Sequence, residues 1–430
     1  MTTLVIGAGP AGLAAVKSLK QAGLPVEGVE KNSDVGGQWL YGAAPSAVYA
    51  SAHLISSKGT TAYADYPMPE NWPAYPHQSL VSDYFKSFAK HFDLYSAITF
   101  NREVSAIERR ENGWRATLSD GTMRDYSNII IANGHLSDPL MPKIAGQFDG
   151  KLMHAKDYKT PDIFEGKRVL VVGMGNTGCD IVVDAIHRAK KVLWSVRGGN
   201  HFTPKFLAGK PADEGNHKSK FVIPKALRSR LHEPILRFLV GPPERFGLPK
   251  PEHRLYDRTP IVNSLVLQHL GQGDVSLRKP IKEFRGSKVA FADGQEDEVD
   301  LVLLATGYEI TFPFLQDLNA LDCQGKAGAP RLFLNVFPQQ DNGLFVAGLL
   351  EGAGVGWPGR ALQSDLIAAY LKAKTNNSDA AADFRHRIEA WHSHAPEKDR
   401  GGHGIFVDFL QYKRDLQRAI ARLSKTTSAR

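Results

Sequence analysis

The stretch Thr3-Leu4-Val5-Ile6-Gly7-Ala8-Gly9-Pro10-Ala11-Gly12 decides the fold of this chain. Residues 3–6 are apolar and largely β-branched, as in a buried parallel strand, and residues 13–22 have the apolar spacing of a helix. Between them, Gly7 permits a tight turn, Gly9 lets the backbone approach a pyrophosphate, and Gly12 allows helix and strand to pack closely. The N–H groups at the start of the helix are then free to bind that phosphate.

An acidic residue follows at the distance that a dinucleotide-binding unit requires. The segment Pro25-Val26-Glu27-Gly28-Val29-Glu30 predicts a second strand that ends on Glu30, whose carboxylate would hold a ribose hydroxyl. A glycine loop alone is weak evidence. Strand, glycines, helix and acid in this order predict a nucleotide-binding domain.

The same pattern recurs at an offset of 166 residues between Gly7 and Gly173. Residues 167–172 predict a strand, Gly173-Met174-Gly175-Asn176-Thr177-Gly178 a phosphate loop, and residues 180–189 a helix. The next strand, residues 192–196, ends on Arg197 instead of an acid. An arginine there accommodates the 2′-phosphate of NADP, so NADPH is the expected cofactor. The alternative is an ordinary exposed arginine, which leaves NADH open.

Composition limits the classes of protein to which the chain can belong. Its 430 residues suggest two to three domains, and its net charge of +8 comes without a basic run or motif for nucleic acid. The two cysteines, Cys179 and Cys323, lie far apart, which excludes a dithiol redox pair and favours a reducing, cytoplasmic location. The first strand begins after two residues and no apolar run is long enough for a membrane span, so neither a signal peptide nor a membrane partner is expected. No metal-binding pattern is present either.

We therefore expect an α/β fold with two Rossmann-like dinucleotide-binding domains. The larger, FAD-binding domain would comprise residues 1–160 and 290–430, and the smaller NAD(P)H-binding domain, residues 161–289, would be inserted in it. Residues 198–260 form a Pro/Lys-rich insertion, and residues 40–80 a long loop over a ligand. The remaining pattern predicts helices at 82–92, 359–372 and 408–423 and strands at 98–100, 104–107, 114–118, 128–132, 300–304 and 343–347.

Several motifs resemble the flavin-containing monooxygenases, a family of class B flavoprotein monooxygenases, in their bacterial soluble form. GAGPAG at residues 7–12 and GGQW at 36–39 are similar to the FAD signature of the family, and GMGNTG at 173–178 to its NADP loop. The run Phe148 to Tyr158 fits FxGxxxHxxxY at each fixed position, and Ala305-Thr306-Gly307-Tyr308 is similar to the family's ATGY element. Gly247 to Pro260 also follows a pattern of the family.

The resemblance implies a set of cofactor contacts. For FAD these are Gly7, Gly9, Pro10, Ala11, Gly12, Glu30, Lys31, Gly37, Gln38, Trp39, Val104, Ala132, Gly348 and Gln363. For NADP they are Gly173, Gly175, Asn176, Thr177, Gly178, Ser195, Arg197, Ala305, Thr306 and Gly307. The identifying motif supplies Phe148, Gly150, His154 and Tyr158, of which the last two would lie at the link between the domains.

The resemblance also implies a reaction. NADPH would reduce FAD, O2 would add to the reduced flavin as a C4a-(hydro)peroxyflavin, and one oxygen atom would pass to a small nucleophilic nitrogen or sulfur substrate. Such a pocket must exclude water, because water and proton leakage release peroxide instead.

Two details bear on the branch of this chemistry. The motif ends in Tyr158, whereas the Baeyer–Villiger branch usually has Trp, and this favours oxygenation of nitrogen or sulfur. The flavin-facing Asn of the family falls on Ile55, which cannot donate a hydrogen bond, so His53, Ser56 or Ser57 is expected to substitute. The candidate catalytic residues are therefore His53, Ile55, Ser57 and Tyr308.

Three alternatives stay open at this point. A Baeyer–Villiger monooxygenase acting on ketones would fit the loss of the Asn. A flavin reductase or electron-transfer dehydrogenase would use the same two cofactors without oxygen transfer. A nucleotide-binding module without catalysis is the third. The oligomeric state also stays open, with a homodimer as the common case for proteins of this size.

Overall fold

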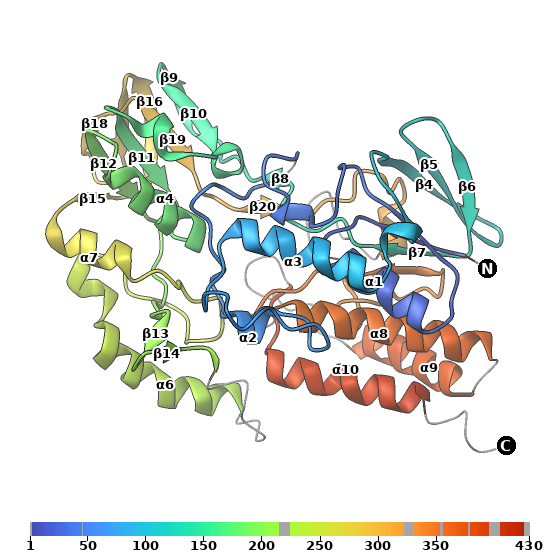
Figure 1. Ribbon diagram of the computed structural model, residues 1–430. Coiled ribbons are helices and arrows are strands. Elements are labelled where there is room, and N and C mark those ends of the chain that lie inside the picture. Colours follow the sequence, from blue (N-terminus) through green and yellow to red (C-terminus); the bar gives the residue numbers. More distant parts are fainter. Residues whose placement is uncertain are drawn as a thin grey trace.

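A computed structural model describes residues 2–44, 46–214, 224–321, 323, 330–352, 356–376, 379–394 and 405–424. Two parallel five-stranded sheets lie at opposite ends of the elongated chain, each with helices packed on it (Figure 1). The α/β fold with two Rossmann-like sheets is therefore confirmed.

The first sheet has the strand order β21-β7-β1-β2-β3. Its strands are β1 (Thr3–Ile6), β2 (Val26–Val29), β3 (Ile98–Thr99), β7 (Asn128–Ile131) and β21 (Leu344–Val346). The long helices around it are α1 (Pro10–Gln21), α3 (Gln78–His91), α8 (Gly356–Thr375), α9 (Asp379–His394) and α10 (Phe409–Ser424). α1 packs against α8, and α10 packs on α8 (Figure 1). β1 and β21 are buried throughout, and β7 is buried at all but its first residue, which is why these three strands read as nearly continuous apolar runs.

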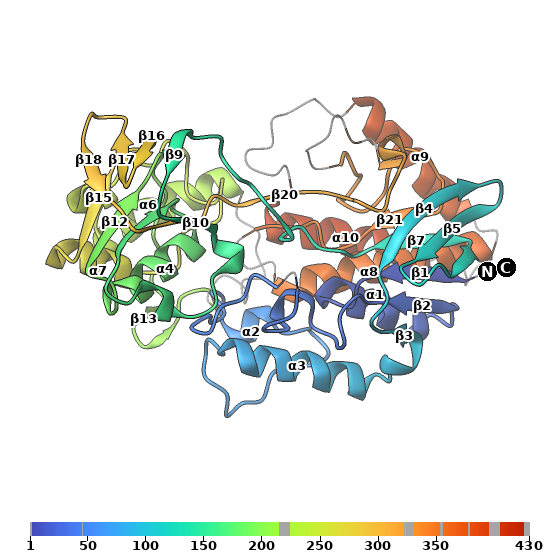
Figure 2. The ribbon, with the colours of Figure 1, turned by 90° about the horizontal axis from the view of Figure 1, so that it is seen from above.

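The second sheet has the strand order β10-β19-β11-β12-β15. Its strands are β10 (Lys151–His154), β11 (Arg168–Val172), β12 (Lys191–Ser195), β15 (Val275–Arg278) and β19 (Leu301–Leu304), with α4 (Asn176–Ile186) and α7 (Leu265–Gln272) beside them. A mixed sheet packs on its outer side, with β9 (Ala145–Phe148), β16 (Ile281–Gly286), β17 (Lys288–Phe291) and β18 (Glu296–Glu298) (Figure 2).

Two extended segments connect the two halves of the molecule. They pair as the short antiparallel strands β8 (Asp138–Pro139) and β20 (Tyr308–Glu309), which lie between the two large sheets in Figure 1. The Thr306 hydroxyl also donates to the Leu140 carbonyl at 2.6 Å. The chain thus crosses between the halves twice along one hydrogen-bonded ribbon.

The predicted domain limits do not follow the sheets. β10 and β19 both belong to the second sheet, although the limits at residues 160 and 290 placed them with the first. The limits were wrong because a buried apolar strand such as residues 301–304 fits either sheet by its pattern, and only long-range pairing decides which one it joins.

Several other elements differ from the predictions. The insertion at 198–260 contains α6 (Lys225–Val240) and the hairpin β13 (Phe206–Leu207) and β14 (Lys210–Pro211), and the 40–80 loop contains the short helix α2 (Lys58–Thr61). A separate meander comprises β4 (Val104–Arg110), β5 (Gly113–Leu118) and β6 (Met123–Tyr126). Helix α9 was not predicted, although Phe384 and Ile388 are spaced as neighbours on one helix face and are buried in the core. Among the described residues, no helix has the length and apolarity that crossing a bilayer would need.

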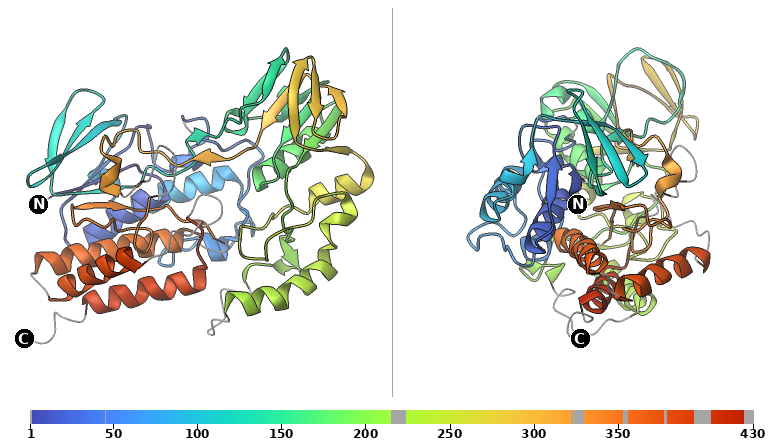
Figure 3. Two further views of the ribbon diagram at one scale, coloured as in Figure 1. Left: turned by 180° about the vertical axis from the view of Figure 1, so that it is seen from behind. Right: turned by 90° about the vertical axis from the view of Figure 1, so that its right-hand side faces the viewer.

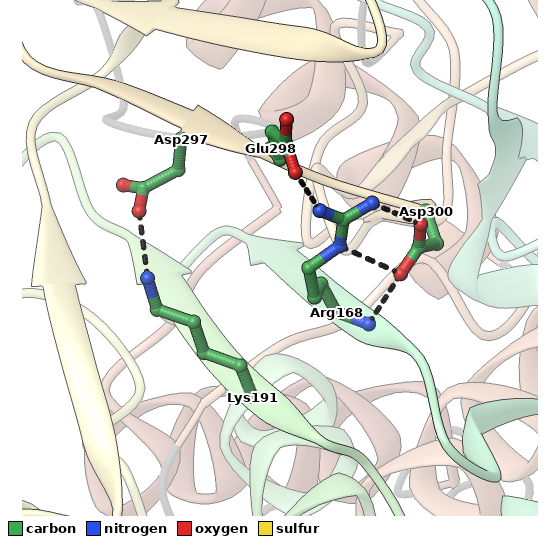
Figure 4. Close-up of polar contacts among 5 residues, drawn as sticks. All are labelled: Arg168, Lys191, Asp297, Glu298 and Asp300. Atoms are coloured by element: carbon green, nitrogen blue, oxygen red, sulfur yellow. Dashed lines mark hydrogen bonds and ion pairs between the residues drawn. The ribbon is translucent and has the colours of Figure 1, made fainter.

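Charged side chains on and beside β11, β12 and β18 form ion pairs that connect the second sheet to the mixed sheet. Arg168 on β11 donates from Nε and from its backbone N–H to one carboxylate oxygen of Asp300, at 3.0 and 2.7 Å, and from a guanidinium nitrogen to the other oxygen at 2.6 Å (Figure 4). Arg168 also contacts Glu298, and Lys191 donates to Asp297 at 2.8 Å. These bonds lower the pKa of Asp300 to about 2.

We predict a pH-dependent loss of stability in Asp300→Asn. The folded pKa of Asp300 lies below the value of about 3.9 for an unfolded chain, so the carboxylate stabilises the fold above about pH 4, and this contribution is lost as the pH falls toward 2. The side chain is 37% exposed, so we expect a cost of only about 1 kcal/mol near neutral pH. Thermal unfolding should show a lower Tm than wild type at pH 7 and a shrinking difference below about pH 4.

The control for this prediction is Asp83→Asn, on the exposed face of α3. A Tm difference for Asp300→Asn that is the same at acid and neutral pH would contradict the assignment.

Candidate functional site

A cavity of about 450 Å³ lies where β1 ends and α1 begins, within the size range of small-molecule sites. Its walls come from the glycine turn, the residues after β2, the Gly37–Trp39 turn and the segments that follow β7 and β21. All the predicted FAD contacts except Gly12 and Gln363 line it: Gly7, Gly9, Pro10, Ala11, Glu30, Lys31, Gly37, Gln38, Trp39, Val104, Ala132 and Gly348.

The glycines keep this cavity open. A Cβ on Gly7, which has a φ of +102°, would lie 2.8 Å from the Ala132 carbonyl oxygen. A Cβ on Gly37 would lie 2.8 Å from the Cα of Gly9, and one on Gly348 would lie 2.7 Å from the Ala11 Cβ. Gly9 is the N-cap of the 12-residue helix α1. Bare backbone and a helix N-terminus therefore meet at one wall, which fits a diphosphate such as that of FAD.

Glu30 lies beside the glycine turn and is 4% exposed. Its carboxylate accepts from the Ala8 N–H at 2.6 Å and from the backbone and side-chain nitrogens of Asn32, both at 2.9 Å. A carboxylate offers about four lone-pair sites. Glu30 therefore closes the glycine turn and retains acceptor capacity toward the cavity for a ribose hydroxyl.

Gly12 and Gln363 lie behind the wall. A Cβ on Gly12 would lie 1.8 Å from the Gly7 carbonyl oxygen, so this glycine lets α1 pack on the turn. The fully buried Gln363 accepts from the Gly348 N–H at 2.9 Å and donates to the Tyr412 hydroxyl at 2.8 Å. Both residues shape the cavity without lining it.

Several charged residues of the cavity were not predicted from the sequence. Arg102, Lys156 and Arg360 line it, together with Glu103, Asp138 and Glu309. Arg360 donates to the Gly356 carbonyl at 2.7 Å, and burial lowers its pKa. Two sequence features could have predicted these contacts. Lys156 lies within the FxGxxxHxxxY run, and Arg360 lies at the start of the helix predicted after the last strand.

A second glycine cradle lies at the start of α4. Gly173 has a φ of +113°, and a Cβ there would lie 2.3 Å from the Ala305 carbonyl oxygen. A Cβ on Gly178 would lie 2.5 Å from the Gly173 carbonyl oxygen, as at the first cradle. A Cβ on Gly175 would meet no atom within 4 Å, so the N-terminus of α4 has an open face. This geometry fits a second diphosphate.

The other residues predicted to contact NADP have different surroundings. Arg197 follows β12 and is exposed, and Thr177 lies in the first turn of α4. Asn176 accepts from the Val262 N–H at 2.7 Å, which ties the helix start to the segment that follows the insertion. Ser195 is 2% exposed and donates to the Lys279 carbonyl at 2.9 Å, so its hydroxyl is engaged within the protein.

The ATGY element connects the cradle to the link between the halves. The Ala305 backbone lies against Gly173. The Thr306 hydroxyl donates to the Leu140 carbonyl, and the Leu140 N–H donates to the Gly307 carbonyl. Thr306 and Gly307 therefore hold the two crossing segments together.

The FxGxxxHxxxY residues lie along the same junction. Phe148 packs on Phe284 with ring centroids 5.1 Å apart, and Gly150 leaves room for that ring and for the Asp300 carbonyl. His154 is 3% exposed, lies 5.2 Å from the Tyr308 ring, and accepts from the Lys156 N–H at 3.1 Å. Burial lowers the pKa of His154, which favours the neutral imidazole.

Two carboxylates on α4 bind the loop of the other half. Asp184 accepts from Tyr158 at 2.6 Å and from Ser51 at 2.5 Å. Asp180 accepts from Tyr49 and from Asn263, both at 2.6 Å. Burial raises the pKa of Asp180, and the carboxylate lies among hydrogen-bond donors. This hydroxyl–carboxylate cluster fixes the second cradle against residues 49–51.

We predict that Asp184→Ala loosens this junction. Losing the acceptor leaves the buried Tyr158 hydroxyl unpaired, at a cost of about 1–3 kcal/mol. Because water then enters between the halves more easily, peroxide released per NADPH consumed should rise several-fold. The two quantities are measured together in one assay.

Asp184→Asn is the matched control, because its amide oxygen can still accept from both hydroxyls. It should restore most of the coupling. Equal peroxide release from the Ala variant and wild type would contradict this role for the cluster.

The predicted catalytic residues do not lie at the cavity: none of His53, Ile55, Ser57 and Tyr308 lines it. His53 is exposed and bonds the Ser51 carbonyl at 2.9 Å, and Ile55 is 37% exposed. Ser57 is fully buried, and its N–H donates to Asp213 of the insertion at 2.7 Å. Tyr308 lies in β20, where burial raises its pKa to about 12. Contacts with the insertion, such as that of Ser57 with Asp213, set the path of the 40–80 loop, and the catalytic roles of these four residues stay predictions.

No group of three or more His, Cys, Asp or Glu residues within the described ranges is arranged to hold a metal ion.

Comparison with known proteins agrees with this geometry. Residues 2–425 match the family of flavin-binding monooxygenase-like proteins. Flavin-containing monooxygenase 5 of Rattus norvegicus is 31% identical over 442 residues, covering 96% of this chain and 82% of the relative. Flavin-containing monooxygenase 1 of Mus musculus is 32% identical over 398 residues, covering 86% and 74%. The relatives include mammalian and bacterial proteins, so a specifically bacterial type is not established.

A crystal structure of OTEMO in complex with FAD and NADP has the same fold. Its TM-score is 0.72 at 20% identity, over 99% of this chain and 98% of that chain. The two cradles and the match along nearly the whole sequence lead to one assignment. The chain belongs to the flavin-binding monooxygenase-like family and is an NADPH-dependent flavin-containing monooxygenase that uses FAD and NADP.

Proposed function

We propose that this enzyme transfers one oxygen atom from O2 to a small nucleophilic nitrogen or sulfur substrate. The observation that carries the proposal is Tyr158 at the end of the identifying motif, where its hydroxyl donates to Asp184 at 2.6 Å. A tyrosine at this position, where the Baeyer–Villiger branch usually has tryptophan, favours the nitrogen- and sulfur-oxygenating branch. The similar proteins include flavin-containing monooxygenases 1 and 5.

The two cradles have separate roles in this proposal. The cavity at α1 would hold FAD, with its diphosphate at Gly9 and a ribose at Glu30. The open face at Gly175 would hold the diphosphate of NADP, with Arg197 toward its 2′-phosphate. When bound, the two cofactors supply hydride transfer and oxygen activation.

The protein's part is binding, orientation and exclusion of water. The paired strands β8 and β20 and the hydroxyl–carboxylate cluster hold the halves at a fixed separation. Lys156 donates to the Ser137 carbonyl at 2.6 Å and reaches the cavity wall on the side of the second cradle. A neutral His154 beside it adds no charge to this junction.

A substrate panel tests the proposal. Purified holoenzyme is given NADPH and O2 with a tertiary amine, a thioether or a cyclic ketone, and oxygenated product, NADPH use and peroxide are measured together. N-oxide or sulfoxide formed in proportion to NADPH supports the proposal. Ester or lactone as the main product overturns it.

The second candidate is Baeyer–Villiger oxygenation of ketones, favoured by Ile55. An apolar side chain stands where the family has an amide, and it is 37% exposed. Ile55→Asn restores the amide, so product ratios from amine and ketone should shift if this position faces the substrate. Unchanged ratios would remove Ile55 from the site.

A further inference from the structure

Arg360, in the second turn of α8, brings a positive charge to the wall of the cavity at α1. Its guanidinium donates to the Gly356 carbonyl at 2.7 Å and to the Leu350 carbonyl at 3.3 Å. An arginine side chain has more N–H donors than these two bonds use, and it stays protonated in proteins. Donors therefore remain for an acceptor inside the cavity.

The charge of Arg360 is not neutralised by the part of the chain that the structure describes, because no carboxylate there forms an ion pair with it. Glu351, which follows Leu350, has its carboxylate 3.4 Å from His135 instead. The other arginine of the cavity, Arg102, donates to Asp120 at 2.6 Å. A half-buried charge without a counter-ion is costly, so the position of Arg360 indicates a ligand that carries or develops negative charge.

The order of the strands places α8 on the side of the diphosphate site away from the adenosine. β1, which leads into the glycine turn, pairs with β2 on one side and with β7 on the other, and β7 pairs with β21. Glu30, toward which the adenosine ribose would lie, follows β2, and its carbonyl accepts from the Arg102 N–H at 3.0 Å. Gly348 follows β21, so the half of FAD on that side is the flavin half.

Two contacts tie Arg360 to the flavin side of the cavity. A Cβ on Gly348 would lie 2.7 Å from the Ala11 Cβ, in the first turn of α1. Gln363, one turn beyond Arg360, accepts from the Gly348 N–H at 2.9 Å. α8 also runs beside α1 (Figure 3). The helix that carries Arg360 is therefore fixed against the wall of the cavity beyond the diphosphate.

The flavin ring changes its charge when it is reduced. Hydride transfer from NADPH gives the ring two electrons and one proton, so the ring gains one negative charge and the nicotinamide gains one positive charge. In the reduced ring this charge is shared by N1 and the C2 carbonyl oxygen, at the pyrimidine edge, whereas the dimethylbenzene edge is apolar. A charge near N1 is one of the means by which a protein tunes a flavin.

We propose that Arg360 binds the pyrimidine edge of the flavin and stabilises reduced FAD more than oxidised FAD. Its guanidinium is positioned by two backbone carbonyls before the cofactor is reduced, so little reorganisation accompanies the change in charge. The proposal rests on the placement of FAD in the cavity at α1, and it does not depend on the choice among amine, thioether and ketone substrates.

The reduction potential of FAD in the substrate-free holoenzyme, measured by equilibration with a redox dye, tests this proposal. Arg360→Gln keeps a donor and removes the charge, so reduced FAD should bind about tenfold more weakly relative to oxidised FAD. The potential should then be about 30 mV lower than that of wild type, because tenfold corresponds to about 30 mV for a two-electron couple. Arg360→Met, a second neutral variant, should lower it at least as much, and Arg360→Lys should retain most of the wild-type value.

Arg102→Gln is the matched control, because it makes the same substitution at the adenosine end of the same cavity. It should leave the potential unchanged. Circular dichroism and flavin content establish that each variant is folded and loaded. A wild-type potential in loaded Arg360→Gln and Arg360→Met overturns the proposal, as does a shift in Arg360→Lys as large as in Arg360→Gln.

Two other outcomes also overturn it. An equal shift in Arg102→Gln would show that the position of the charge is unimportant. An unchanged potential with a raised KM only for thioethers that bear a carboxylate would assign Arg360 to the substrate. A wrong placement of FAD gives a different result, namely full flavin content in a folded Gly12→Ala variant, where the Cβ would lie 1.8 Å from the Gly7 carbonyl oxygen.

Discussion

Gly12→Ala is expected to abolish the retention of FAD during purification. The added Cβ would lie 1.8 Å from the Gly7 carbonyl oxygen, which is backbone and cannot move aside alone. Either α1 shifts away from β1 or the turn opens, at a cost of about 3 kcal/mol or more. Since each 1.4 kcal/mol is about tenfold in affinity, FAD should bind at least a hundredfold more weakly. Flavin absorbance per protein after gel filtration measures the loss.

Two further variants separate a lost cofactor from a lost fold. Gly9→Ala places a Cβ 3.5 Å from the Gly37 Cα, an ordinary contact, so the protein should fold while the new methyl narrows the cavity. It should retain less FAD than wild type with unchanged circular dichroism. Gly198→Ala, where a Cβ meets no atom within 4 Å, should retain FAD fully. Full flavin content in folded Gly12→Ala would refute the cradle.

Arg197→Ala is expected to raise the KM for NADPH by about 10- to 100-fold. A charge-assisted hydrogen bond to a phosphate contributes about 1.5–3 kcal/mol, and Arg197 is exposed at the end of β12, where a 2′-phosphate would lie. The KM for NADH should change less than about twofold, because NADH lacks that phosphate. Steady-state rates with both cofactors give the two values.

The control for this experiment is Arg285→Ala. Arg285 is an exposed arginine on β16, paired with Glu283 and Glu296 away from the cradle. It should leave both KM values near those of wild type. Equal increases for NADPH and NADH in Arg197→Ala would rule out recognition of the 2′-phosphate by this side chain.

The sequence by itself determined the two cradles. Gly12 and Gly178 are required because a Cβ there would lie within 3 Å of the carbonyl oxygen five residues earlier, that of Gly7 and Gly173 respectively, and the spacing of the motif encodes such short-range geometry. Glu30 was found for the same reason, since it ends a strand paired directly with β1. The strands and amphipathic helices followed from apolar periodicity.

Only the tertiary structure decided which strands join which sheet and where the 40–80 loop runs. β19 pairs with both β10 and β11 across long separations in sequence, which a local pattern cannot encode. Ser57 is buried because Asp213, more than 150 residues away, accepts from its N–H, and no spacing indicates that contact. Local backbone geometry fixes where the cofactors bind, while contacts distant in sequence decide which side chains surround them.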